Sequence, residues 1–156
     1  MIQRIQTFYL ALVTAACILM FFFPMATYIH DVRGTYVFFV YGMKYLMEPP
    51  VIVSFWLIFP LLFLTAATGI LCLVAIFLYK KRKLQILFVS IAFFLQIILI
   101  TSVFLFYMNH FDQLLQVEHS YRFGVFIPLV SLGFLILANR AIKKDESMVQ
   151  SADRLR

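Results

Sequence analysis

The stretch Lys80-Lys81-Arg82-Lys83 separates two long apolar runs and decides the fold class. Residues 51–79 contain no Asp, Glu, Lys or Arg, and neither do residues 84–110. Each lysine or arginine costs about 2.5–3.5 kcal/mol near the centre of a bilayer, so four in a row cannot lie in hydrocarbon. Each flanking run exceeds the roughly 20 residues that cross about 30 Å of hydrocarbon as a helix. We therefore expect two separate membrane-spanning helices joined by a cytoplasmic turn.

The composition is that of a membrane protein. The 156 residues are 64% apolar and 13% charged, against about 45–50% and about 25% in soluble domains. A net charge of +6 would suit a nucleic acid, but the basic residues flank apolar runs and form no polar basic face, so we exclude that partner. Cys17 and Cys72 lie inside apolar runs and are expected to pack there.

Four spans are predicted, at about residues 5–25, 51–79, 84–108 and 121–139. The first is expected to be an uncleaved signal anchor, because its uncharged run is too long for a signal peptide. At the start of the fourth, Arg122 is expected to extend its guanidinium to the headgroups. Residues 1–140 thus predict an all-α membrane protein, an antiparallel four-helix transmembrane bundle.

The basic residues divide unevenly between the two sides of this topology. With both termini inside the cell, ten lysines and arginines face the cytoplasm and three face outward. Cytoplasmic loops carry the excess of positive charge, so we expect both termini in the cytoplasm of a bacterial inner membrane. The three outward cations are Arg33, Lys44 and Arg122.

The first outer loop, residues 28–50, is long enough to fold by itself. Its residues 35–41 are rich in aromatic and β-branched side chains and are bounded by Gly34 and Gly42, which is typical of a strand. We favour a short β-hairpin or strand, with a helix lying in the interface plane as the alternative. The second outer segment, residues 109–120, is expected to extend the third helix before a turn.

No Asp, Glu, Lys, Arg or His lies deep within a predicted span. Ion-coupled transporters, proton relays and retinal pumps need such groups in the bilayer, so the sequence argues against these classes. The polar residues Thr14, Thr68, Gln96 and Ser131 lie near the middle of the four spans. They predict a midplane polar layer that fixes helix register, with contact to a ligand as the alternative.

Three prolines, Pro24, Pro60 and Pro128, fall in the outer third of predicted spans. Proline removes a helix hydrogen bond and favours a kink. Together the three would splay the outer half of the bundle into a cleft lined by phenylalanines. The alternative is that they only reflect the higher frequency of proline in membrane helices.

The histidines His30, His110 and His119 all lie on the outer side, near carboxylates. Imidazoles in such positions can bind metal or haem, but no pair has the spacing of a metal site on one helix, and there is no CxxCH motif. Nucleophile–base pairs, phosphate loops and paired carboxylates cannot be identified either. We therefore expect no catalytic residue, no metal and no cofactor.

The cytoplasmic ends and the basic turn carry the residues that we expect to bind a partner protein or anionic lipid headgroups. Residues 141–156 lack glycine and proline and predict an amphipathic helical tail that continues the fourth span. The apolar stripe of this tail, which includes Ile142, needs cover from another chain, the basic turn or the lipid surface. The predicted binding residues are Gln3, Arg4, Lys80, Lys81, Arg82, Lys83, Arg140, Lys143, Lys144, Asp145 and Glu146.

Three motifs carry a family resemblance: Met1-Ile2-Gln3-Arg4-Ile5-Gln6-Thr7, residues 78–85 around the basic turn, and residues 137–146 with the terminal 151–156. In these motifs the chain resembles a domain-of-unknown-function family of small four-span inner-membrane proteins of Gram-negative bacteria. The resemblance covers the whole chain and implies the four-span count. It implies no activity, substrate or cofactor.

The sequence thus predicts a non-enzymatic integral inner-membrane protein, a scaffold or accessory subunit that acts through its cytoplasmic ends. Its partner would be another membrane protein or a second copy of the chain. The first alternative is a binder or carrier of a lipid-like molecule in the outer-half cleft. The second alternative is a haem or quinone redox protein.

Overall fold

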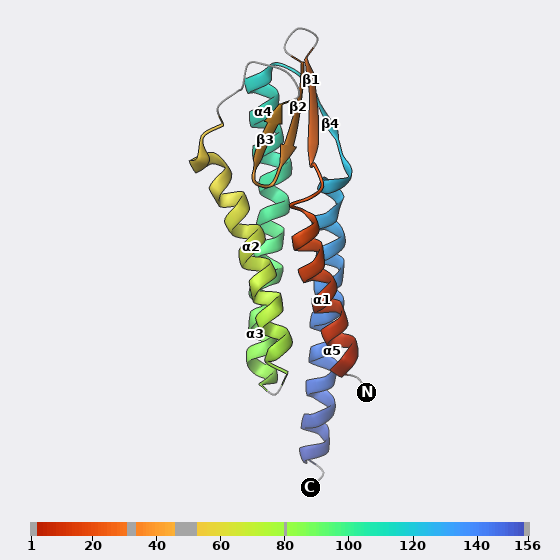
Figure 1. Ribbon diagram of the computed structural model, residues 1–156. Helices are drawn as coiled ribbons and strands as arrows, with labels where there is room; N and C mark the ends of the chain where they lie inside the picture. Colours follow the sequence, from red (N-terminus) through yellow and green to blue (C-terminus); the bar gives the residue numbers. More distant parts are fainter. Residues whose placement is uncertain (1–2, 31–33, 46–52, 80, 155–156) are drawn as a thin grey trace.

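Helices make up most of the molecule, and a small sheet caps one end of them (Figure 1). The computed structural model describes residues 3–30, 34–45, 53–79 and 81–154. The helices are α1 (Gln3–Leu19), α2 (Phe55–Phe77), α3 (Arg82–Thr101), α4 (Met108–Leu115) and α5 (Ile127–Arg154). The strands are β1 (Ala26–His30), β2 (Gly34–Phe39), β3 (Gly42–Tyr45) and β4 (His119–Tyr121).

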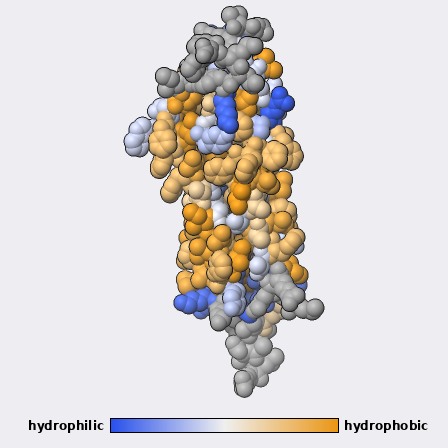
Figure 2. Space-filling view, viewed as in Figure 1, coloured by the Kyte–Doolittle hydropathy of each residue, from blue (hydrophilic) through white to orange (hydrophobic). Residues whose placement is uncertain are grey.

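The helices pack side by side, α1 against α2 and α5, and α3 against α2 and α5. Small residues let the backbones approach, and a Cβ added at Gly69 of α2 would lie 3.3 Å from Cys17 Cβ of α1. Large apolar side chains point outward all round, for example Phe63, Ile70 and Phe94. They form a hydrophobic band between more hydrophilic ends (Figure 2), a surface suited to lipid and not to water.

Among the described residues, three helical stretches are long and apolar enough to cross a membrane: Phe55–Phe77, Arg82–Leu115 and Phe123–Met148. The apolar part of α1, Ile5–Leu19, is shorter. Arg82–Leu115 is continuous because a π-helical segment, η1 (Ser102–Tyr107), joins α3 to α4. Its 34 residues rise about 51 Å, well beyond the thickness of a hydrocarbon core. The α4 part of this helix therefore lies beyond that thickness, where it packs against the sheet.

The sheet is antiparallel, with strand order β3-β2-β1-β4. β1 and β2 form a hairpin in which Tyr28 lies opposite Tyr36. On its other side β1 pairs with β4, with Tyr28 opposite His119. Strand structure in the first outer loop is thus confirmed, and β2 covers most of the predicted segment 35–41.

One face of the sheet packs against α4 and η1 through aromatic rings. Phe38 of β2 lies between Tyr107 and Phe111, with ring centroids 6.0 and 4.9 Å away. Tyr28 of β1 meets Phe111 edge-on at 6.2 Å. The buried rings form a core separate from the helix contacts near the opposite end. The sheet is thus fixed to the helix that projects beyond the apolar band.

Two irregular segments, one after α1 and one before α5, form backbone hydrogen bonds with each other. Gly124 N–H donates to Pro24 O at 2.9 Å, and Arg122 N–H donates to Met25 O at 2.9 Å. Met25 N–H in turn donates to Phe38 O at 2.8 Å. Non-helical backbone near hydrocarbon needs such partners, because no water is present to supply them. We call these two segments, residues 20–25 and 122–126, the joint.

The first predicted span, residues 5–25, is not helical at its outer end, because α1 ends at Leu19. Proline disfavours helix in the residue before it, and Pro24 follows a run of three phenylalanines that the joint uses as a turn. β1 then begins at Ala26, two residues before the predicted start of the outer loop.

The fourth predicted span, residues 121–139, is likewise not an α-helix at its start. β4 occupies His119–Tyr121, a 3-10 turn (Phe123–Phe126) follows, and α5 begins only at Ile127. The pairing of β4 with β1 is a long-range contact that no local pattern reveals. Consequently Arg122 does not begin a helix, and its Nε donates to Thr27 Oγ1 at 2.7 Å.

The expectation of three kinked helices is wrong for two of the three prolines. Pro24 lies outside α1, and Pro128 lies in the first turn of α5, where its missing N–H would have no helical partner anyway. Of the three, only Pro60 lies in the interior of a helix, α2. The other two predicted spans lie close to the observed helices, Phe55–Phe77 for 51–79 and Arg82–Leu115 for 84–108. The third helix extends into residues 109–120 as predicted.

Candidate functional site at the basic end

The start of α1, the turn between α2 and α3 and the last turns of α5 lie at the end of the molecule opposite the sheet (Figure 1). We call this the basic end, and the opposite one the sheet end. The exposed cations of the basic end are Lys81, Lys83, Arg140, Lys143 and Lys144. At the sheet end the described residues contribute two exposed cations, Lys44 and Arg122.

Arg82 fastens the extension of α5 to the helical bundle. Its Nη1 lies 3.5 Å from Asp145 Oδ2 and donates to the backbone oxygen of Asp145 at 3.3 Å. The two side chains are 27% and 13% exposed, so the pair is partly shielded from water. We place its contribution at about 1 kcal/mol, the upper range for surface pairs.

At the basic end, two buried glutamines donate hydrogen bonds to backbone carbonyls of neighbouring helices. Gln6 of α1 donates from Nε2 to Ala141 O at 3.2 Å, and Gln85 of α3 donates to Ala75 O at 3.0 Å. Ala141 and Asp145 are one turn apart on α5, so α1 and α3 both hold the same turn of that helix. Ile142, between them, is buried in the helix core. The predicted apolar stripe of the tail therefore begins under cover of the bundle itself.

The structure places the predicted binding residues in three ways. Arg82 and Asp145 are paired with each other, and the five exposed cations surround them. Glu146 is half-buried. Gln3 and Arg4 lie in the first turn of α1, where the backbone alone is described, and Lys80 lies outside the described residues. The last turns of α5 project past the other helices (Figure 1).

Of the predicted midplane layer, the structure brings two members together. Gln96 Nε2 donates to Ser131 Oγ at 2.6 Å and to Pro128 O at 3.0 Å, joining α3 to α5. Thr14 and Thr68 instead donate to carbonyls of their own helices. Gln96 Oε1 is buried and has no hydrogen-bond donor among the described residues. The layer is thus one interhelical contact and two local ones.

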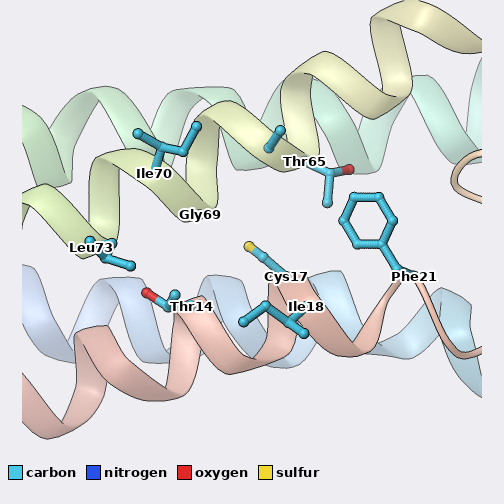
Figure 3. Close-up of a pocket in the computed structure, with 9 residues that line it drawn as sticks. Thr14, Cys17, Ile18, Phe21, Thr65, Gly69, Ile70 and Leu73 are labelled. Carbon is cyan, nitrogen blue, oxygen red and sulfur yellow. The ribbon is translucent and has the colours of Figure 1, made fainter.

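An apolar pocket of about 220 Å³ lies between α1 and α2 (Figure 3). The hydroxyl of Thr14 donates to Leu10 O and that of Thr65 to Leu61 O, so neither hydroxyl is available as a donor to a molecule in the pocket. Its chemistry is therefore that of hydrocarbon. The lining residues are Thr14, Cys17, Ile18, Phe21, Thr65, Ala66, Gly69, Ile70 and Leu73.

At the sheet end, one histidine pairs with a carboxylate. His119 Nδ1 of β4 lies 2.9 and 2.8 Å from the two oxygens of Asp112 of α4. His110 stacks on Phe106 instead, at 5.8 Å. Asp31, the carboxylate that follows His30 in the sequence, lies outside the described residues. Within the described part of the chain, no three His, Cys, Asp or Glu side chains gather where a metal ion could bind.

Tyr28 is fully buried beside this pair. Burial, and after it the charge of Asp112, raises the pKa of Tyr28 above the usual tyrosine range. The hydroxyl therefore stays protonated and donates to Met108 Sδ at 3.6 Å. The pair Asp112–His119 thus ties β4 to α4 beside a protonated tyrosine that serves as a packed core residue.

The sequence analysis did not predict that Gln6 and Gln85 are buried and hydrogen-bonded to neighbouring helices. Gln6 and Gln85 lie within the family-like motifs, but only their position within one helical turn of a basic residue, Arg4 or Lys83, hinted at a buried role. An amide near the end of an apolar run, where it can reach a free helix carbonyl, is the signal that could have found them.

Comparison with known proteins gives one match. Neither a curated protein nor a solved structure matches the chain. Residues 2–155 match the family described as Domain of unknown function (DUF4293), which is nearly the whole chain. This confirms the resemblance to a domain-of-unknown-function family, and the chain belongs to the DUF4293 family.

Proposed function

We propose that this chain is a four-span protein of the bacterial inner membrane, with both termini in the cytoplasm, that acts as a non-enzymatic scaffold or accessory subunit. The observation that carries the proposal is the apolar band with exposed cations concentrated at one end. In the proposal the basic end faces the cytoplasm, and the projecting part of α5 contacts a partner protein.

The apolar band supports the membrane placement. Exposed phenylalanines, leucines and isoleucines cover three long helices, and in water this area would favour aggregation. α1 rises only about 26 Å over its 17 residues. The phenylalanines of the joint continue its apolar surface beyond Leu19, and the backbone hydrogen bonds of the joint make that continuation tolerable in hydrocarbon. A fourth crossing can therefore consist of α1 plus the joint.

The charge distribution supports the orientation. Five exposed cations and the Arg82–Asp145 pair lie at the basic end, against Lys44 and Arg122 at the sheet end among the described residues. Positive residues near span ends stay in the cytoplasm during insertion.

Cysteine labelling tests the orientation. In intact spheroplasts, an impermeant maleimide should label Glu118→Cys at the sheet end and should label Ser147→Cys only after the membrane is opened. Glu118 and Ser147 are both exposed, whereas the native Cys17 and Cys72 are buried. Labelling of Ser147→Cys in intact cells would refute the proposed topology.

Deletion of residues 147–156 tests the docking role. The deletion leaves the Arg82–Asp145 and Gln6–Ala141 contacts in place, so the bundle should stay folded. We expect proteins crosslinked to the full chain in native membranes to be lost from the shortened one. An unchanged crosslinking pattern would refute docking through the extension. Loss of binding to anionic vesicles, with no protein lost, would assign the extension to lipid instead.

A further inference from the structure

A second apolar groove, of about 260 Å³, lies between α1 and the α5 side of the joint. One wall comes from α1, with Leu12, Ala15 and Leu19, and the other from Phe123, Phe126 and Val130. The groove lies in the half of the molecule toward the sheet end, because it includes the last residue of α1 and the 3-10 turn before α5. Every lining side chain is hydrocarbon or aromatic.

The groove exists because both helices stop short of the sheet. α1 ends at Leu19 and α5 begins at Ile127, and the joint occupies the space between these helix ends and the sheet. The wall is tightly packed at this point, because a Cβ added at Gly124 would overlap Pro24 O. The neighbouring Phe123 is nevertheless 68% exposed, so its ring lines a groove that the rest of the fold leaves open.

Arg122 directly precedes this wall. Its backbone N–H bonds to Met25 O, and its side-chain Nε donates to Thr27 Oγ1 at 2.7 Å. These two bonds anchor the residue where the joint meets the sheet. No other partner of this exposed guanidinium occurs among the described residues. The remaining guanidinium donors form a planar fork, the geometry that binds phosphate oxygens in pairs.

We propose that the α1–α5 groove binds one phospholipid of the leaflet at the sheet end, with an acyl chain along Ala15 and Phe126 and the phosphate on Arg122. The inference rests on the proposed membrane placement. Charge complementarity selects the occupant: an anchored, exposed cation one residue before the wall of a wholly apolar groove matches an anionic head joined to a hydrocarbon tail. In the pocket between α1 and α2, by contrast, no lining residue has a lysine or arginine next to it in the sequence, so that pocket lacks such a cation.

The test compares two lipids with identical tails on the delipidated full-length protein in mild detergent. Dioleoyl phosphatidylglycerol carries the phosphate, and dioleoylglycerol does not. By native mass spectrometry we expect one phosphatidylglycerol per chain, retained about fivefold more strongly than dioleoylglycerol, the effect of about one cation on an anionic headgroup. Equal retention of the two lipids would overturn the phosphate assignment without any variant being needed.

Two variants locate the site, each with a matched control. Ala15→Leu should fill the groove and abolish retention of both lipids, whereas Ala11→Leu, at an exposed alanine one turn away on α1, should not. Arg122→Gln should lower phosphatidylglycerol retention to the level of dioleoylglycerol, whereas Lys44→Gln at the same end should leave it unchanged. Retention by Ala15→Leu equal to that of the native chain, or a lipid-free dimer, would overturn the proposal.

Failure of the phospholipid site can be distinguished from failure of the proposed membrane placement. If alkaline carbonate releases the protein from membranes, the membrane placement itself fails. If the protein resists carbonate but shows no preference between the two lipids, only the phospholipid site fails.

Discussion

Within the joint, Gly124 lies so close to the segment of residues 20–25 that a methyl group has no room there. A Cβ would lie 2.4 Å from Pro24 O and 2.6 Å from Phe23 O, and both are backbone atoms that cannot move aside without breaking the joint. We expect Gly124→Ala to destabilise the protein by about 2 kcal/mol, in the range of overpacked cores. Thermal unfolding in detergent measures the loss.

Gly133 is the matched control for this substitution. It lies within α5, is exposed, and a Cβ added there meets nothing within 4 Å. Because alanine favours helix over glycine by about 1 kcal/mol, Gly133→Ala should be neutral or stabilising. If the two variants unfolded at the same temperature, close packing at Gly124 would not be the cause.

Substitutions at Gln96 and Thr68 compare the loss of interhelical hydrogen bonds with the loss of a bond within one helix. Gln96→Leu removes the two bonds from α3 to Ser131 and Pro128, which should cost about 1 kcal/mol, within the range for membrane helices. Thr68→Val keeps the side-chain shape and removes only a bond to Leu64 O of the same helix, so it should be nearly neutral. Equal unfolding temperatures of the two variants would contradict this assignment.

The sequence showed that Gln96 needs a partner but not which one. Depth along a span can be counted from the charged turn, and this places Thr14, Thr68, Gln96 and Ser131 at similar levels. Which side chains face each other depends on helix rotation, which span counting ignores. A threonine can satisfy itself on its own helix, whereas the longer glutamine reaches a neighbour.

Secondary structure was predictable where the pattern is local. Gly34 and Gly42 bound a run rich in aromatic and β-branched residues, and this pattern marks β2 because strand and turn preferences act over a few residues. β4 has three residues and forms only because β1 presents a free edge about ninety positions earlier in the chain. The late start of α5 follows from β4, so the apolar run from Tyr121 gave the wrong helix start for the same reason.

The contact between α3 and the α5 extension makes a separate prediction. Arg82→Ala and Asp145→Ala should each free residues 141–148 to exchange amide hydrogens faster. In a double-mutant cycle we expect a coupling of about 0.5–1 kcal/mol. Lys83→Ala, at an exposed neighbour of Arg82 on the same helix, should change neither exchange nor stability. A coupling of zero would show that the pair does not hold the extension.

The whole molecule combines an apolar band, a sheet fixed to one end and charge concentrated at the other. The sheet is carried by α4, the part of a helix too long for hydrocarbon, through Phe38 and Phe111. The opposite end is closed by amide and ion-pair contacts and surrounded by lysines and arginines. Orientation should therefore depend on the basic turn, whatever the partner of α5 is.

Reversing the charge of Lys80, Lys81 and Lys83 to glutamate, with Arg82 and its bridge to Asp145 retained, tests this dependence. The change removes three positive charges from the turn between α2 and α3 and adds three negative ones. Because lysine and arginine hold short loops in the cytoplasm, we expect a mixed or incomplete insertion of the α2–α3 pair. Reporter fusions after residue 81 and after Glu118 measure it. Lys44→Glu is the control, since a lost cation at the sheet end should leave insertion unchanged. Native topology in the triple variant would show that the remaining cations of the basic end suffice to orient the chain.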